Sequence, residues 1–137
     1  MVLLIDANVI LDFLLEREGF FEDACDVMER CAAGHAKGYV AFHSISNIWY
    51  VLRGVDENVK RGYLKRLCRI LEVCGATHAA VERALDKADF KDLEDCLQDQ
   101  CALAVHSDYI VTKNTGDFVH AETRTITPAD LKRFYPR

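Results

Sequence analysis

The sequence lacks the features that mark membrane, secreted or multidomain chains. It has only two prolines and seven glycines, and no tract rich in either that would separate two domains. No apolar stretch approaches the roughly 20 residues that a membrane-spanning helix needs. The apolar start at Met1 reaches Asp6 almost at once and has no basic flank, which argues against a signal peptide. We therefore expect a cytoplasmic protein with one domain over residues 1–137.

The cysteines and histidines have no metal-binding or disulfide spacing. The five histidines are scattered and form no HExxH motif, and no two cysteines form a CxxC pair. Without a secretory signal, free thiols on apolar helix faces are the expected state. A zinc site is not predicted. The six cysteines concerned are Cys25, Cys31, Cys68, Cys74, Cys96 and Cys101.

Positive charge is also in short supply. Apolar residues make up 50% of the chain and charged residues 28%, which is the balance of a folded globular protein. The formal net charge is −5, whereas a protein that coats nucleic acid without specificity is usually basic. If the chain handles RNA, a local basic patch must bind it. Clustered carboxylates that bind metal would explain the acidic excess.

Short apolar runs typical of strands alternate with amphipathic segments typical of helices. The predicted strands cover residues 2–5, 38–42, 72–75, 109–112 and 124–127. The predicted helices cover residues 9–14, 20–33, 44–53, 56–72, 77–87, 92–105 and 128–134. This alternation predicts an α/β fold in which helices cover both faces of a parallel sheet.

Polar residues follow the predicted strands where sites form in open α/β sheets. Asp6 closes the first strand, and Asn47 lies in the first turn of the helix after the second strand. Asp95 lies in the first turn of the helix that leads into the strand at residues 109–112, and Asp117 follows that strand. Each has a purely structural alternative, because Asp6 can cap a helix and Asp92 with Asp95 resembles a capping box.

The helix at residues 92–105 favours the functional interpretation. Asp92, Asp95 and Asp99 form one arc beside its apolar stripe, and like charges at this spacing disfavour a helix. A divalent cation would offset the repulsion. Oxygen ligands without nearby sulfur or imidazole suit Mg²⁺ or Mn²⁺.

Metal held by carboxylates can activate water and shield phosphate charge, which is the chemistry of phosphodiester cleavage. Asp6, Asp95 and Asp117 are the candidate ligands and catalytic residues. An aspartyl phosphotransferase with Asp6 as nucleophile is a weaker alternative, because Asn8 occupies the place where that chemistry usually has a second acid.

Three motifs in this order resemble the PIN domain family. The first is Ile5-Asp6-Ala7-Asn8-Val9-Ile10-Leu11-Asp12, and the second is Asp92-Leu93-Glu94-Asp95-Cys96-Leu97-Gln98. The third runs from Asp108 through Thr112-Lys113-Asn114-Thr115-Gly116-Asp117 to Phe118. The ordered set is more specific than any one motif, and it spans nearly the whole chain.

The resemblance, closest to VapC-like toxins, implies a three-layer α/β/α sandwich with four to five parallel strands. It also implies a metal-dependent ribonuclease, often the homodimeric toxin of a toxin–antitoxin pair, with a small antitoxin protein as partner. By position it assigns the metal-site acids to Asp6, Asp95 and Asp117, and accessory roles to Asn47, Asp92, Glu94 and Asn114. Asn47 departs from the pattern, because the family commonly has glutamate there. A binding module with little nuclease activity is therefore the alternative function.

Cations and aromatic residues supply candidate RNA contacts. Lys113, beside the proposed site, is the candidate contact to substrate phosphate. Trp49 lies at helical spacing with apolar neighbours and is interpreted as core or dimer interface, although stacking on bases stays open, as it does for Tyr50. One predicted helix carries a basic stripe, which is either a phosphate-binding face, a solvated face or a surface for an acidic partner. The stripe consists of Lys60, Arg61, Lys65, Arg66 and Arg69.

Overall fold

The computed structural model describes all 137 residues and has a five-stranded parallel sheet at its centre. The strand order is β3-β2-β1-β4-β5, so the first strand lies in the middle. Leu4 of β1 pairs with Tyr39 on one side and with Ile110 on the other. The strands are β1 (Val2–Ile5), β2 (Lys37–Ala41), β3 (Glu72–Cys74), β4 (Tyr109–Val111) and β5 (Thr125–Ile126). The predicted parallel sheet is confirmed.

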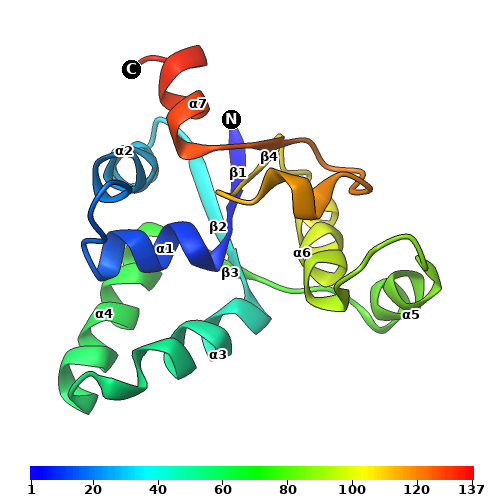
Figure 1. Cartoon of the computed structure of the whole chain (residues 1–137), viewed down its shortest axis with the longest axis horizontal. Coiled ribbons are helices and arrows are strands. Elements are labelled where there is room, and N and C mark those ends of the chain that lie inside the picture. The colour runs from blue at the N-terminus through cyan, green and yellow to red at the C-terminus, as the bar shows by residue number, and fades with distance from the viewer.

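Helices cover both faces of the sheet (Figure 1). One face carries α1 (Ala7–Leu14), α2 (Phe21–Ala32), α3 (Phe42–Val51), α4 (Glu57–Ile70) and α7 (Pro128–Phe134). The other face carries α6 (Leu93–Ala104), with α5 (His78–Asp86) packed against it. Two short 3-10 helices, η1 (Leu52–Gly54) and η2 (Thr115–Phe118), complete the chain. No helix is long and apolar enough to span a bilayer.

Burial is unequal on the two faces. The larger core cluster has 21 buried residues and joins β1 and β2 to α1, α2, α3, α4 and α7. The smaller cluster has seven and joins the same sheet to α6 and η2. Because β1 is buried on both faces, its Leu3, Leu4 and Ile5 are all fully inaccessible, as expected for the middle strand of a covered parallel sheet. Asp6 therefore directly follows a strand that is fully buried.

Gly38 of β2 is the glycine whose missing side chain the packing requires. A Cβ atom there would lie 2.5 Å from both the Cys31 sulfur and Leu71 Cδ2. The helix on this face can therefore approach the sheet closely only because residue 38 has no side chain.

The predicted elements are confirmed with small shifts at their ends. The helix after β2 begins at Phe42 and not at residue 44, because Ala41 is the last extended residue and the chain turns helical at once. The loop after β4 contains η2, which has no apolar periodicity to predict it. None of the six cysteines forms a disulfide; four are buried, Cys25 is half-buried and Cys68 is exposed.

Candidate active site

Asp6 lies where β1 ends and α1 begins. It caps α1, because its Oδ1 accepts a hydrogen bond from the Ala7 amide at 2.8 Å. Its Oδ2 accepts from the Thr112 hydroxyl at 2.7 Å and from the Asn8 amide group at 3.2 Å. Burial raises the pKa of this carboxyl, and the hydrogen bonds from Thr112 and Ala7 oppose that rise. The capping role and the site role thus belong to the same side chain.

A buried polar chain fixes Asp6 from the opposite face of the sheet. Gln98 of α6 donates to Asp6 Oδ1 at 3.2 Å and accepts from the Ser44 hydroxyl of α3, also at 3.2 Å. The sequence analysis did not single out Gln98 or Thr112. Gln98 lies one turn after Asp95 on the same helix, and Thr112 directly follows a buried strand, so their placement was the available signal. Both act as positioning residues.

Asp95 is a half-buried carboxyl without a partner. Its carboxylate accepts no hydrogen bond and forms no ion pair. The predicted capping box is therefore only half formed: Asp92 caps α6 by accepting a hydrogen bond from the Glu94 amide at 2.8 Å, but Asp95 accepts none from the Asp92 amide. Burial first, and then the negative charges of Asp92, Asp6 and Asp117, raise the pKa of Asp95 to about 7. Repulsion of this kind is what a bound cation would relieve.

Asp117 lies on η2 and faces the start of α6 across a cleft of about 540 Å³. Its exposed side chain also accepts no hydrogen bond from the protein, and its charge contributes to the raised pKa of both Asp6 and Asp95. Asp92 lines the same cleft. Segments far apart in sequence therefore bring Asp6, Asp95 and Asp117 close enough for their charges to act on one another.

Asn47 of α3 reaches the site through Glu94. Its side-chain amide donates to Glu94 Oε1 at 3.3 Å. Glu94 in turn is among the charges that raise the pKa of Asp6. The position that the sequence analysis identified as lacking a glutamate is thus bonded to a glutamate from another helix.

Asp99 does not join the acidic arc that helical spacing predicted. It is fully buried, and its two oxygens accept hydrogen bonds from the backbone amides of Glu122 at 2.9 Å and Thr123 at 3.1 Å. This carboxylate anchors the loop that follows η2. Asp99, which was expected only to share a helical arc with Asp92 and Asp95, is therefore engaged by the backbone of that loop.

Lys113 and Asn114 lie between β4 and η2. The Lys113 ammonium is 2.9 Å from Oδ2 of Asp12, a carboxylate only 1% exposed that also pairs with Arg17. It lies 4.0 Å from the centroid of the Phe20 ring as well. Lys113 therefore has a structural partner that the sequence analysis did not foresee, and its contact to substrate phosphate stays a prediction. Asn114 is exposed, and its amide N–H donates to the Thr112 hydroxyl at 3.1 Å.

The acids suit a divalent cation in their chemistry but do not form a preassembled ligand cage. No three Asp, Glu, His or Cys side chains lie close enough together to ligate one ion directly. The two Asp6 oxygens are engaged by four protein donors, whereas Asp95 and Asp117 are free to accept. Oxygen donors, mutual repulsion and the absence of an ion pair to any of the three fit Mg²⁺ or Mn²⁺.

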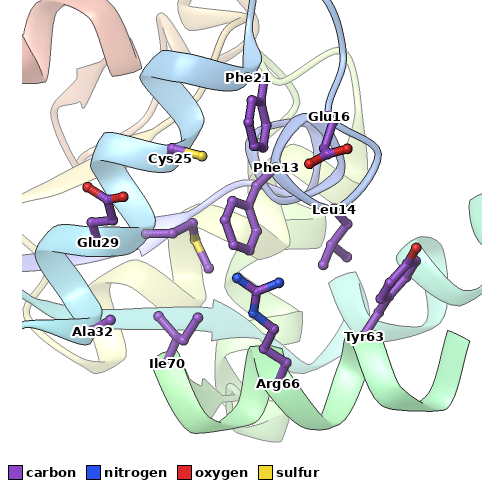
Figure 2. Close-up of a pocket in the computed structure, with 11 residues that line it drawn as sticks. Phe13, Leu14, Glu16, Phe21, Cys25, Glu29, Ala32, Tyr63, Arg66 and Ile70 are labelled. Carbon is purple, nitrogen blue, oxygen red and sulfur yellow. The ribbon is translucent and has the colours of Figure 1, made fainter. Parts of the chain in front are cut away.

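A second concavity lies away from the acids, between α1, α2 and α4 (Figure 2). It has a volume of about 360 Å³ and an apolar floor that includes Phe13, Phe21 and Ile70. Arg66 extends from α4 toward Phe13, with its guanidinium 5.0 Å from the ring centroid, and forms no ion pair (Figure 2). Glu29 borders the groove from α2.

The comparisons with known proteins agree with this geometry. A family model described as PIN domain matches residues 2–116. Ribonuclease VapC1 of Aquifex aeolicus strain VF5 is 28% identical over 116 residues, which cover 82% of this chain and 74% of that protein.

Two solved structures show the same fold at low identity. VapBC2 of Rickettsia felis, bound to a DNA fragment from their promoter, has a TM-score of 0.70 at 12% identity over 93% of this chain and 98% of that one. VapC20 of Mycobacterium tuberculosis, a toxin that cleaves the sarcin–ricin loop, has a TM-score of 0.62 at 13% identity over 79% and 86%. The chain belongs to the PIN domain family, as its three ordered motifs predicted.

Proposed function

We propose that this protein is a metal-dependent endoribonuclease and the toxin of a toxin–antitoxin pair. The observation that carries the proposal is the gathering of Asp6, Asp95 and Asp117, with mutual repulsion and no cationic partner. Two comparisons support it, since one similar protein is named a ribonuclease and another an RNA-cleaving toxin. Family membership makes a nuclease the expected function, but the argument for it rests on the residues of the site.

Some of these residues would bind the metal, and others orient the residues that bind it. Asp95 and Asp117 would hold Mg²⁺ or Mn²⁺, because both carboxylates are without protein donors. Bound metal supplies an activated water and shields charge on the phosphate. Asp6 completes the set, and Thr112 and Gln98 fix its two oxygens. These hydrogen bonds hold Asp6 in one orientation, which is what a catalytic carboxylate requires.

A second candidate function is a PIN-fold binding module with weak or no nuclease activity, which Asn47 favours because an amide brings no charge. The contact from Asn47 to Glu94 argues for activity instead. Glu94 supplies a carboxylate beside the place where the family has one, and its charge acts on Asp6. We assign Glu94 the accessory role of restoring negative charge to the site.

Metal binding to the Glu94→Gln variant tests that assignment. Calorimetry with Mn²⁺ should show affinity reduced about 10-fold or more, the scale of losing a supporting group near a metal. Glu82→Gln on α5 is the matched control, because Glu82 is exposed, does not line the acidic cleft and pairs only with His78. Cleavage of mixed RNA should fall in parallel for Glu94→Gln alone. Equal affinity in both variants would favour the binding-module alternative.

We place the antitoxin partner at the apolar groove between α1, α2 and α4. An amphipathic helix of a partner would bury its apolar side there, as helix-in-groove recognition does, and a carboxylate on it would meet the unpaired Arg66. A toxin that is blocked by a small protein needs such a surface outside the acids.

Ala32 and Ala33 make a matched pair for testing the partner. Both are exposed at the end of α2, but only Ala32 lines the groove. Co-expression with a small protein encoded beside this gene gives the assay: Ala32→Arg should abolish co-purification with that protein, and Ala33→Arg should preserve it. Loss of both or retention of both would contradict the placement. Homodimerisation stays a prediction; the exposed Phe42 and Leu93 offer apolar area for it, and light scattering measures it.

A further inference from the structure

Several cations on η1 and α4 have no carboxylate partner. Arg53, Lys65 and Arg69 are exposed and form no ion pair within 4 Å, although the chain has a net charge of −5. Arg61, on the same side of α4, is paired only with the exposed Glu57. Surface pairs of this kind are weak and easily exchanged for another anion. The region therefore presents positive charge that the protein itself does not neutralise.

Aromatic rings lie among these cations. Trp49 borders a shallow hollow of about 420 Å³ whose other walls include Arg61, Lys65 and Arg69. The Lys60 ammonium lies 3.8 Å from the centroid of the Trp49 ring. Tyr50 is 63% exposed, and the Arg53 guanidinium lies 4.4 Å from its ring centroid. We name Trp49, Tyr50, Arg53, Arg61, Lys65 and Arg69 the α3–α4 surface.

Helix α3 connects this surface to the acids. Asn47, near its start, is bonded to Glu94 beside the candidate active site. Tyr50 follows three residues later on the same helix face, since residues at that spacing are neighbours. Figure 1 shows α3 running from the ends of the strands toward α4. A chain that lies along α3 would meet the acids at one end and the cations at the other.

The acids themselves repel a polyanion. Asp6, Asp95, Asp117 and Glu94 form no ion pair with any lysine or arginine of the chain, and a nucleic acid strand would add further negative charge. Affinity for RNA must therefore come from another part of the surface, since phosphate contacts to Lys and Arg dominate such binding. Aromatic rings beside the cations add stacking of unpaired bases, which is how proteins bind single strands.

We propose that the α3–α4 surface binds a single-stranded segment of the RNA substrate next to the cleavage site. Phosphates contact Arg53, Lys65 and Arg69, and bases stack on Tyr50 and on the open part of Trp49. The proposal rests on the ribonuclease function and names the part of the substrate that this chain holds. An acidic peptide would use the cations but not the aromatic rings, so the combination favours RNA.

The salt dependence of binding tests the cations. Each variant carries Asp6→Asn to prevent cleavage, and a fluorescein-labelled single-stranded RNA of mixed sequence is titrated by anisotropy between 50 and 200 mM salt. Lys65→Gln/Arg69→Gln should lower affinity about 10-fold and reduce the slope of log K against log salt by about 1.4, which is 0.7 per lost contact. The control, Lys132→Gln/Arg133→Gln on α7, removes the same charge and should leave the slope unchanged. Equal changes in both variants would overturn the proposal.

Trp49 provides an independent reading because it is the only tryptophan. RNA that stacks near it should quench its fluorescence at the concentrations that raise the anisotropy, and the Lys65→Gln/Arg69→Gln variant should need about 10-fold more RNA. Binding without any change in Trp49 emission would contradict a base contact there. Poly-glutamate that binds as tightly as RNA, with the same loss in the variant, would replace RNA by an acidic protein partner.

Cleavage by the proteins with intact Asp6 separates failure of this proposal from failure of the ribonuclease function. If the wild type cuts RNA with metal, the Lys65→Gln/Arg69→Gln variant should show a KM raised about 10-fold with kcat nearly unchanged. Equal KM values would overturn the α3–α4 surface while the nuclease function stands. Specific binding through this surface without cleavage under any metal would support the surface and overturn the nuclease function.

Discussion

Removal of the Asp99 carboxylate should destabilise the protein strongly and displace the loop after η2. The side chain is fully buried and accepts two backbone hydrogen bonds, from Glu122 at 2.9 Å and from Thr123 at 3.1 Å. A hydrogen bond to a charged group contributes about 1.5–3 kcal/mol, so Asp99→Ala should lower the free energy of unfolding by about 3–5 kcal/mol. For a chain of this length that corresponds to a fall in Tm of roughly 9–15 °C.

Urea unfolding followed by Trp49 fluorescence and by circular dichroism measures the effect. Asp99→Asn retains one acceptor oxygen and should lose about half as much, which keeps the prediction testable if the alanine variant does not fold. Asp86→Ala is the control, because Asp86 is exposed and unpaired, and it should change stability by less than about 0.5 kcal/mol. An Asp99→Ala protein within that same margin of the wild type would refute the assignment of Asp99 as an anchor.

The remaining predictions concern other buried or repelled groups. The pKa of Asp95 is raised to about 7 in the folded state, so stability is lost as pH rises from the unfolded pKa to that value and the side chain becomes charged. Asp95→Asn should therefore be more stable than the wild type by ~1–2 kcal/mol at pH 8 after solvent screening, and the difference should vanish toward pH 4. Thermal unfolding at a series of pH values measures this difference. A pH-independent difference would contradict this. Asp12→Ala should lower stability by about 1–2 kcal/mol in urea unfolding, because it removes the buried carboxylate that pairs with the partly exposed Lys113 and Arg17. Gly38→Ala should lower the free energy of unfolding by about 1–3 kcal/mol in the same assay, because the added methyl group would clash with Leu71. An unchanged urea midpoint would show that the neighbouring side chains move to make room for it.

The sequence predicted the elements because their apolar spacing is local. Every strand and helix longer than four residues follows from a run or a periodicity visible in the sequence. That Asp6 and Asp117 lie near each other was predictable for a related reason, since both follow strands of one parallel sheet, whose carboxyl ends meet at the same edge. Asp6 was also correctly weighed as a helix cap, whereas its role in the site stays a prediction.

The contacts that orient the site could not be predicted, because their partners are far apart along the chain. Gln98 lies 92 residues from Asp6, and Thr112 lies 106 residues from it. Lys113 and Asp12 are 101 residues apart, so nothing local shows that Lys113 is already paired. The partners of Asp99 could not be predicted either, because helical spacing gives the direction of a side chain but not the loop that covers it.

The carboxylates of this protein should bind a metal that is required for RNA cleavage. The direct measurement compares the wild type with Asp6→Asn, both stripped of metal, on mixed RNA with Mg²⁺ or Mn²⁺ added back. Asn retains the helix-capping ability of Asp6, so the variant should fold while losing the charge. We expect the wild type to cleave RNA only when metal is present, and the Asp6→Asn variant not to cleave it. Cleavage by both proteins alike, or no cleavage and no metal binding by either, would contradict it.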